Sequence, residues 1–166
     1  MSIEGMGQPG TLETDAVTVR TMQDSDLESV VAIDAAATGR RRPSYFRRML
    51  DRAVKEADFQ ISLVAELEGV VAGCIVATLY YGEYGVMEPW ASIETIGVLP
   101  EFRQKHVGKA LMRQLRMNLG ALQIEKVRTQ VTWNNFELLR FFESSGFKPA
   151  DQVCLELVLD PTAPDI

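Results

Sequence analysis

Residues 98–110 read Val-Leu-Pro-Glu-Phe-Arg-Gln-Lys-His-Val-Gly-Lys-Ala and join a predicted strand, residues 91–98, to a predicted helix that ends near Gly120. Apolar residues recur every four positions on one face of this helix: Val107, Leu111, Leu115 and Leu119. The N–H groups of a first helical turn have no partner within the helix, and the positive end of the helix dipole lies beside them. The sequence therefore predicts an anion site in this loop, and phosphate is the anion that we expect there.

Length and composition predict a single domain. The chain has 166 residues, 46% of them hydrophobic, which is enough for one core. We expect a flexible N-terminal tail at 1–15, the domain at 16–160 and a C-terminal tail at 161–166. The sequence has no apolar run of about 18 residues, as a membrane span needs. The first residues also lack the basic and apolar regions of a signal peptide, so we expect a cytoplasmic protein without a membrane partner.

The charge distribution limits the possible partners. A formal net charge of −6 argues against nucleic-acid binding and favours a cationic substrate. One cluster departs from this balance, and its residues are Arg40, Arg41, Arg42, Arg47, Arg48 and Arg52. A solvated helix face explains it better than a site for an acidic partner, and it argues against a simple polycation as substrate.

The two cysteines predict neither a metal site nor a disulfide framework. Cys74 and Cys154 lie far apart, each in an apolar run with the pattern of a strand. Free Cys is among the residue types most often buried, so we expect two buried free thiols and no bound metal.

The remaining elements follow from periodicity and turn residues. We expect strands at 17–20, 60–67, 70–81, 91–98, 126–132 and 153–159, with a tight hairpin at Glu68-Gly69. We expect helices from a capping box at Ser25-x-x-Glu28, at 44–57, after residue 106 and at 134–145. This order gives a mixed α+β fold and does not fit the strict alternation of a doubly wound dinucleotide-binding sheet.

Two motifs in this order resemble the GNAT superfamily of N-acetyltransferases. The first, Arg/Gln-x-x-Gly-x-Gly/Ala, is filled by residues 103–108 with His106 where the first glycine usually stands. The second appears as Asn135, Phe142, Gly146 and Phe147. The resemblance spans residues 17–159. It implies a central twisted mixed sheet of about six to seven strands flanked by about four helices.

The resemblance also implies a coenzyme site for acetyl-coenzyme A. Its contacts would come from the strand, the loop and the two motifs: Ile96, Gly97, Val98, Arg103, Gln104, Lys105, His106, Val107, Gly108, Lys109, Asn135 and Phe142. His106 carries a Cβ where a glycine would not, although His tolerates the left-handed region better than most residues. We interpret His106 as a loop side chain near phosphate and not as a general base.

Two residues of the second motif have structural alternatives. Asn135 can contact the coenzyme, or it can belong to the helix start, where Asn134-x-x-Glu137 predicts that Asn134 is the cap. Phe142 stands where the family often has a tyrosine that protonates the leaving thiolate, and a phenyl ring cannot donate a proton. Packing in the helix core is the other interpretation of Phe142.

Glu94 is the candidate catalytic residue. An amine acceptor is protonated at neutral pH, so a base must remove a proton before the amine can attack a thioester. Glu94 lies in the strand at 91–98 and resembles the strand glutamate of polyamine acetyltransferases in this superfamily. Between Ile93 and Ile96 its pKa would be raised by desolvation. A solvated glutamate on a strand is the alternative interpretation.

The function predicted from these residues is acetyl transfer from acetyl-coenzyme A to a primary amine by direct attack in a ternary complex. The amine can be a protein lysine, an N-terminal amine or a small molecule. The alternative is a non-catalytic acyl-coenzyme A-binding sensor, which the departures at His106 and Phe142 keep open. An exposed strand edge leaves a homodimer open as well.

Overall fold

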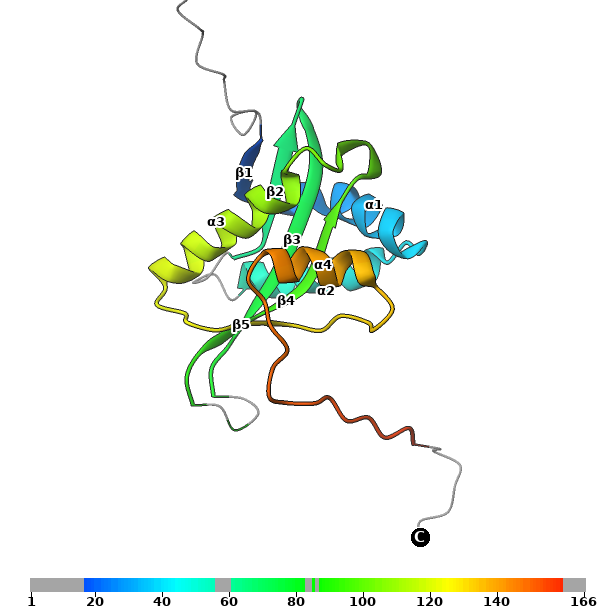
Figure 1. Ribbon diagram of the computed structural model, residues 1–166. Helices are drawn as coiled ribbons and strands as arrows, with labels where there is room; N and C mark the ends of the chain where they lie inside the picture. Colours follow the sequence, from blue (N-terminus) through cyan, green and yellow to red (C-terminus); the bar gives the residue numbers. More distant parts are fainter. Residues whose placement is uncertain (1–16, 56–60, 83–84, 86, 160–166) are drawn as a thin grey trace, which may run out of the picture. The chain divides into compact units, whose positions relative to one another are not determined.

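The computed structural model describes residues 17–55, 61–82, 85 and 87–159 (Figure 1). Outside them lie the predicted tails at 1–15 and 161–166, the predicted helix end at Ala57 and the predicted strand start at Gln60. The chain divides into two compact units, Met1–Gln130 and Val131–Ile166.

The first unit contains one mixed sheet. Its strands, in spatial order, are β1 (Thr18–Thr21), β2 (Leu63–Leu67), β3 (Val70–Tyr80), β4 (Trp90–Val98) and β5 (Val127–Thr129). Neighbours from β1 to β4 pair antiparallel, whereas β4 and β5 pair parallel. The α+β class with a mixed sheet is confirmed. The expected number of six to seven strands was wrong for the described residues, which form five.

The hairpin between β2 and β3 is the tight turn that the sequence predicts. Leu67 pairs with Val70, so only Glu68 and Gly69 remain in the loop. Both have positive φ angles, 55° and 74°. Positive φ at both central residues is typical of a type I′ turn, whose twist matches that of the two strands.

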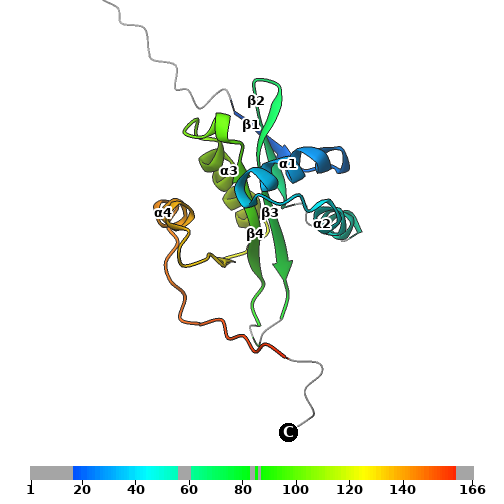
Figure 2. The same cartoon turned by 90° about the vertical axis from the view of Figure 1, so that its right-hand side faces the viewer.

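Helices cover both faces of this sheet (Figure 2). The helices α1 (Leu27–Thr38) and α2 (Pro43–Lys55) lie on one face, and α3 (Val107–Ala121) lies on the other. Two glycines of the sheet allow α3 and α1 to pack closely against the strands. A Cβ at Gly73 of β3 would lie 2.7 Å from Cγ1 of Val107, and a Cβ at Gly97 of β4 would lie 2.7 Å from Cγ2 of Ile33. The missing side chains therefore set how near α3 and α1 approach the strands.

The start of α1 differs from the prediction. A 3-10 turn, η2 (Asp24–Asp26), precedes the helix, and the capping interaction runs from the N–H of Gln23 to Oδ2 of Asp26 at 2.7 Å. The box at Ser25-x-x-Glu28 was therefore wrong. Asp26 also receives two hydrogen bonds from Arg20, at 2.7 and 2.8 Å, and Arg20 donates a third to Glu66 at 2.8 Å. This buried carboxylate ties η2 to Arg20 of β1, which in turn bonds to Glu66 of β2.

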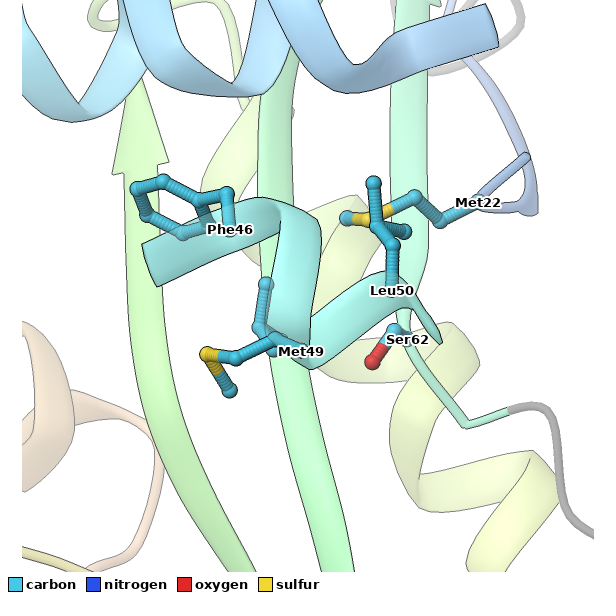
Figure 3. Close-up of a pocket in the computed structure, with 6 residues that line it drawn as sticks. Met22, Phe46, Met49, Leu50 and Ser62 are labelled. Carbon is cyan, nitrogen blue, oxygen red and sulfur yellow. The ribbon is translucent and has the colours of Figure 1, made fainter. Parts of the chain in front are cut away.

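The core beneath α1 and α2 is apolar. Val30, Val31 and Phe46 are almost fully buried there and belong to one cluster with Val64 and Val76 of the sheet. A small hollow remains between α2 and the strands, and Figure 3 shows its lining by Met22, Phe46, Met49, Leu50 and Ser62. The Ser62 hydroxyl is used by the backbone of Ala77, so the hollow offers a ligand mainly apolar walls.

The second unit contains one helix, α4 (Phe136–Ser144), within its described residues. The strand predicted at 153–159 was wrong, because residues 152–159 have no strand pairing and Val153, Leu155 and Leu157 are 79% to 88% exposed. Alternating apolar residues predict a strand only where a sheet edge supplies backbone partners. Cys154 lies in this segment and is exposed, so the expectation of two buried thiols holds for Cys74 alone.

Candidate active site

Glu94 lies at an irregularity in the pairing of β3 with β4. Val76 is opposite Thr95 and Ala77 is opposite Ile93, so Glu94 is an extra residue, as in a β-bulge. A bulge bends its strand and changes the direction of a side chain, and bulges are frequent next to active sites. The sequence carries a signal for it, because Ile93 and Ile96 are three positions apart in a strand whose period is two.

The bulge determines which face of the sheet carries Glu94. Side chains alternate between faces along a strand, and Gly73 opens toward α3. Ala77 is four residues after Gly73 on β3 and so lies on the same face. Ile93 pairs with Ala77 and therefore also lies on the α3 face. The next residue, Glu94, is then on the face of α1 and α2, and so is Thr95. Two successive side chains share one face, which regular alternation would forbid.

The β4–β5 ladder ends just before the bulge. Pairing runs only from Ala91–Val127 to Ile93–Thr129, and the Thr129 hydroxyl donates to the Ile93 carbonyl at 3.0 Å. Residues 94–98 of β4 therefore have no β5 residue beside them. This half of β4 presents its backbone at an edge that the shorter strand leaves open.

Two peptide groups point to this open edge. The Leu99 N–H donates to the Ala72 carbonyl at 2.8 Å, on the side of β3. Because backbone groups alternate in direction along a strand, those of Ile96 and Val98 point to the other side. Before the bulge the odd-numbered residues face β5, as the bond from Ala91 N–H to the Lys126 carbonyl at 2.9 Å indicates. The bulge thus moves the even-numbered peptides to the open edge.

The loop before α3 has the left-handed backbone that its motif requires. His106, the cap residue of α3, has φ 61° and ψ 15°, and Gln104 has φ 61°. The expectation that a histidine can adopt the conformation of the missing glycine is confirmed. The side chain of His106 makes no capping hydrogen bond to the first turn of α3. The N–H groups of that turn are therefore offered to a ligand or to water.

Arginine, lysine and histidine side chains surround this helix start. Arg103, Lys105, His106 and Lys109 are all exposed, and Lys105 lies 3.7 Å from Glu68 in an exposed ion pair. Val107, by contrast, is buried against β3 at Gly73. The first turn of α3 is thus anchored by an apolar contact while its cations face outward.

Glu94 is more exposed than the sequence suggested. Its side chain belongs to the exposed class, although Ile93 and Trp90 of the same strand are buried. The desolvation expected from Ile93 and Ile96 was therefore wrong in its premise, because both isoleucines lie on the α3 face and Glu94 lies on the opposite one.

A second polar group lies on the same face. Asp34 of α1 is 3% exposed and accepts two hydrogen bonds from Arg42, at 2.9 Å from Nε and 2.6 Å from Nη2. The Arg42 guanidinium lies 4.8 Å from the centre of the Tyr45 ring. Burial raises the pKa of Tyr45, and the negative charge of Glu94 raises it further. The sequence alone does not link Tyr45 to Glu94, because nothing local joins residues of α2 and β4.

The second unit corrects one further prediction. Asn135, and not Asn134, caps α4, because its side-chain oxygen accepts a hydrogen bond from Leu138 N–H at 3.2 Å. Phe142 is 4% exposed, and its ring contacts Phe141 and Phe147 with centroid separations of 5.4 and 4.9 Å. Packing explains Phe142, and the coenzyme contacts of Asn135 and Phe142 stay predictions of the resemblance.

Cys74 does not have the environment of a nucleophile. Burial raises the pKa of Cys74 to about 12, so this thiol stays protonated. Within the described ranges, no cluster of His, Cys, Asp and Glu side chains could hold a metal ion. None of the helices in this part of the chain is both long and apolar enough to cross a membrane.

Comparison with known proteins identifies the family. The model of the acetyltransferase (GNAT) family matches residues 27–147. Ard1 from Thermoplasma volcanium is 26% identical with a TM-score of 0.66, over 80% of this chain and 83% of that one. AAC(6')-Ih from Acinetobacter baumannii, an aminoglycoside antibiotic 6'-N-acetyltransferase, is 16% identical with a TM-score of 0.70, over 87% and 99%.

A third structure shares the fold and carries a ligand. AAC(6')-Iy in complex with the bisubstrate analog CoA-S-monomethyl-acetylneamine is 20% identical with a TM-score of 0.69, over 87% of this chain and 99% of that one. The chain belongs to the GNAT family of acetyltransferases.

Proposed function

We propose that this acetyltransferase moves an acetyl group from acetyl-coenzyme A to a primary amine by direct attack in a ternary complex. One observation carries the proposal: the open half of β4 and the uncapped start of α3 belong to one unit and are joined by only eight residues, 99–106. An extended ligand with amides at one end and phosphates at the other matches this pair of features.

The donor would bind mainly to backbone. The peptide groups of Ile96 and Val98 at the open edge suit the amide groups of a pantetheine arm, which would lie along β4 like an added strand. The N–H groups of Val107, Gly108 and Lys109 suit the pyrophosphate. The exposed cations Arg103, Lys105 and Lys109 add charge attraction around that point.

The chemistry on the acceptor side begins with Glu94. Its carboxylate takes a proton from the acceptor ammonium, whose reference pKa is about 10.4 for a lysine-type amine. The neutral nitrogen then attacks the thioester carbonyl, the C–N bond forms and the C–S bond breaks. The second proton of the nitrogen ends on the thiolate, so the products are an amide and free coenzyme A. An exposed Glu94 can return its proton to water after each turnover.

The absence of a tyrosine at Phe142 is compatible with this reaction. A thiol with a reference pKa of about 8.5 is an acceptable leaving group near neutral pH without a proton donor. A covalent acetyl-enzyme is not part of the proposal, because the raised pKa of Cys74 keeps its thiol protonated. The acceptor can be a protein lysine, an N-terminal amine or a small molecule, and pairing of two chains through a sheet edge remains a prediction.

Release of thiol from acetyl-coenzyme A tests the proposal. The protein is incubated with acetyl-coenzyme A and, in turn, a lysine peptide, a peptide with a free N-terminus, spermidine and an aminoglycoside, while calorimetry measures binding of coenzyme A alone. We expect saturable binding and a thiol release that requires an amine. Binding without amine-dependent release for the whole panel would favour the non-catalytic sensor instead.

A further inference from the structure

Tyr45 lies on α2, which covers the face of the sheet that carries Glu94. Tyr45 is in the first turn of α2 and packs against the core cluster that contains Val76. Val76 is the residue of β3 opposite the bulge, where Thr95 pairs with it and Glu94 is inserted. The strand register puts Glu94 on this same face of the sheet, the face that α1 and α2 cover. Packing and strand register put the phenol and the carboxylate on one face of the sheet, and the charge of Glu94 acts on Tyr45.

The position of Tyr45 is fixed by a neighbour in the loop before α2 and by one on α2. Arg42 stacks over its ring at 4.8 Å, and Phe46 meets it edge to face at a centroid separation of 5.0 Å. Arg42 cannot swing away easily, because both oxygens of the buried Asp34 hold its guanidinium. The charge of Arg42 is neutralised by the same contact, so Glu94 keeps a net negative charge on this face.

We propose that Tyr45 is a second acceptor-site residue, whose phenolic oxygen holds the acceptor amine beside Glu94. The inference rests on the proposed amine acetylation and adds to it the group that orients the nitrogen. An ammonium offers several N–H donors, and a phenol can accept one of them while the carboxylate accepts another. When Glu94 has taken its proton, the remaining contact to Tyr45 keeps the nitrogen lone pair directed at the thioester.

The electrostatics of the site suit this role. Burial and the nearby charge of Glu94 both raise the pKa of Tyr45, so the phenol stays neutral throughout the neutral range. The charge of Arg42 lowers the pKa of Tyr45, and the charge of Asp34 raises it. A neutral phenol is both a donor and an acceptor, whereas a phenolate would hold the ammonium more tightly and keep it protonated.

The test compares Tyr45→Phe with Tyr81→Phe, which removes the hydroxyl of an exposed tyrosine at the end of β3. The ring of residue 45 and its contacts with Arg42 and Phe46 survive the change. With whichever amine of the panel is turned over best, we expect Tyr45→Phe to lower kcat/KM for the amine by about 10-fold to 100-fold, as for a hydrogen bond to a charged group. Affinity for coenzyme A and the melting temperature should stay unchanged, and Tyr81→Phe should resemble the parent protein.

Equal kcat/KM in Tyr45→Phe and the parent would overturn the inference while leaving amine acetylation intact. Equal losses in both tyrosine variants would overturn it as well. No turnover of any amine by the parent would instead reject the proposed function, and the amine role with it.

A titration of tyrosine absorbance gives a readout that does not need turnover. Subtracting the titration curve of Tyr45→Phe from that of the parent isolates the ionisation of Tyr45. The same subtraction is made with both proteins carrying Glu94→Gln. Removing the Glu94 charge should move the ionisation of Tyr45 to lower pH. An unmoved ionisation would show that the two groups do not interact and would overturn the inference on its own.

Discussion

The two faces of the sheet differ in the interactions that position the residues around β4. On the face of α3, a missing side chain at Gly73 admits Val107 and sets the helix start where phosphate is expected. On the face of α1 and α2, a buried pair, Asp34 and Arg42, holds Tyr45 in the region that Glu94 faces. The donor side thus depends on backbone and shape, and the acceptor side on charged and polar side chains. Changes on one face should therefore leave binding of the other substrate unchanged.

The largest effect is expected on the acceptor face. Glu94→Gln keeps the size of the side chain and removes its basicity, so kcat should fall by about 10²-fold to 10⁴-fold. Because Glu94 lies on the face opposite α3, affinity for acetyl-coenzyme A should not change. Steady-state kinetics and calorimetry measure the two quantities. The matched control is Glu125→Gln, which changes an exposed glutamate before β5 and should preserve both.

The pH dependence of this variant sharpens the result. If Glu94 is the base, turnover by the parent protein rises with pH as more of the acceptor amine loses its proton, and Glu94→Gln alters that profile. A parent rate that does not vary with pH, or a variant that is as active as the parent, would remove Glu94 from the mechanism.

The next effect is expected on the donor face. In Gly73→Ala the new methyl group would lie 2.7 Å from Val107, 3.0 Å from the Gly97 carbonyl and 3.2 Å from Leu111. Overpacking of this kind costs about 1–3 kcal/mol, and its relief must move the start of α3. We expect acetyl-coenzyme A to bind about 10-fold more weakly, equivalent to about 1.4 kcal/mol of that range, as calorimetry would measure.

Gly120→Ala is the control for this change. Beyond its chain neighbours and the backbone of its own helix, no atom lies within 4 Å of a Cβ at this position near the end of α3, and its φ is not positive. Alanine should stabilise the helix by about 0.5–1 kcal/mol and leave coenzyme affinity unchanged. If both glycine variants bind the coenzyme like the parent, the contact of Val107 with β3 does not position the anion site.

Local sequence patterns were sufficient to predict the helix start and the hairpin. The loop at 98–110 and the apolar face of α3 predicted the helix that begins at Val107, and Glu68-Gly69 predicted the turn. Both rest on residue types that act within a few positions, namely periodic apolar residues and a glycine with positive φ. His106 likewise adopts the left-handed backbone expected at its position.

Features that depend on distant partners were missed. The segment 153–159 alternates like a strand but lacks a paired edge, and the amide oxygen of Asn135 had two competing uses that only geometry could separate. The bulge at Glu94 left a trace in the spacing of Ile93 and Ile96, but the side chain's exposure follows from the register with β3. Tyr45 is about fifty residues from Glu94 in sequence, and no local rule joins them.

The smallest effect concerns a second aspartate–arginine pair, which lies away from β4 and should matter for stability alone. Arg20 holds the pKa of Asp26 below its ordinary value through hydrogen bonds, with a further contribution from the Gln23 N–H. A lowered pKa stabilises the fold above the unfolded value of about 3.9. That stabilisation is lost as the pH falls through the folded pKa.

Asp26→Asn should therefore destabilise the protein at neutral pH by about 1.5–3 kcal/mol, the range for a hydrogen bond to a charged group. The difference from the parent should shrink below about pH 4. Denaturant unfolding at several pH values measures it. Kinetic constants should match the parent, whereas a change in kcat comparable to that of Glu94→Gln would show that this pair also serves the reaction.

Chemical shifts of backbone amides test the proposed donor site most directly, because particular N–H groups are expected to hold the coenzyme. The protein, labelled with nitrogen-15, is titrated with acetyl-coenzyme A while the amide signals are followed. We predict saturable shifts that are largest at Ile96 and Val98 and at Val107, Gly108 and Lys109. Saturable shifts centred elsewhere, with these five amides unmoved, would contradict that prediction.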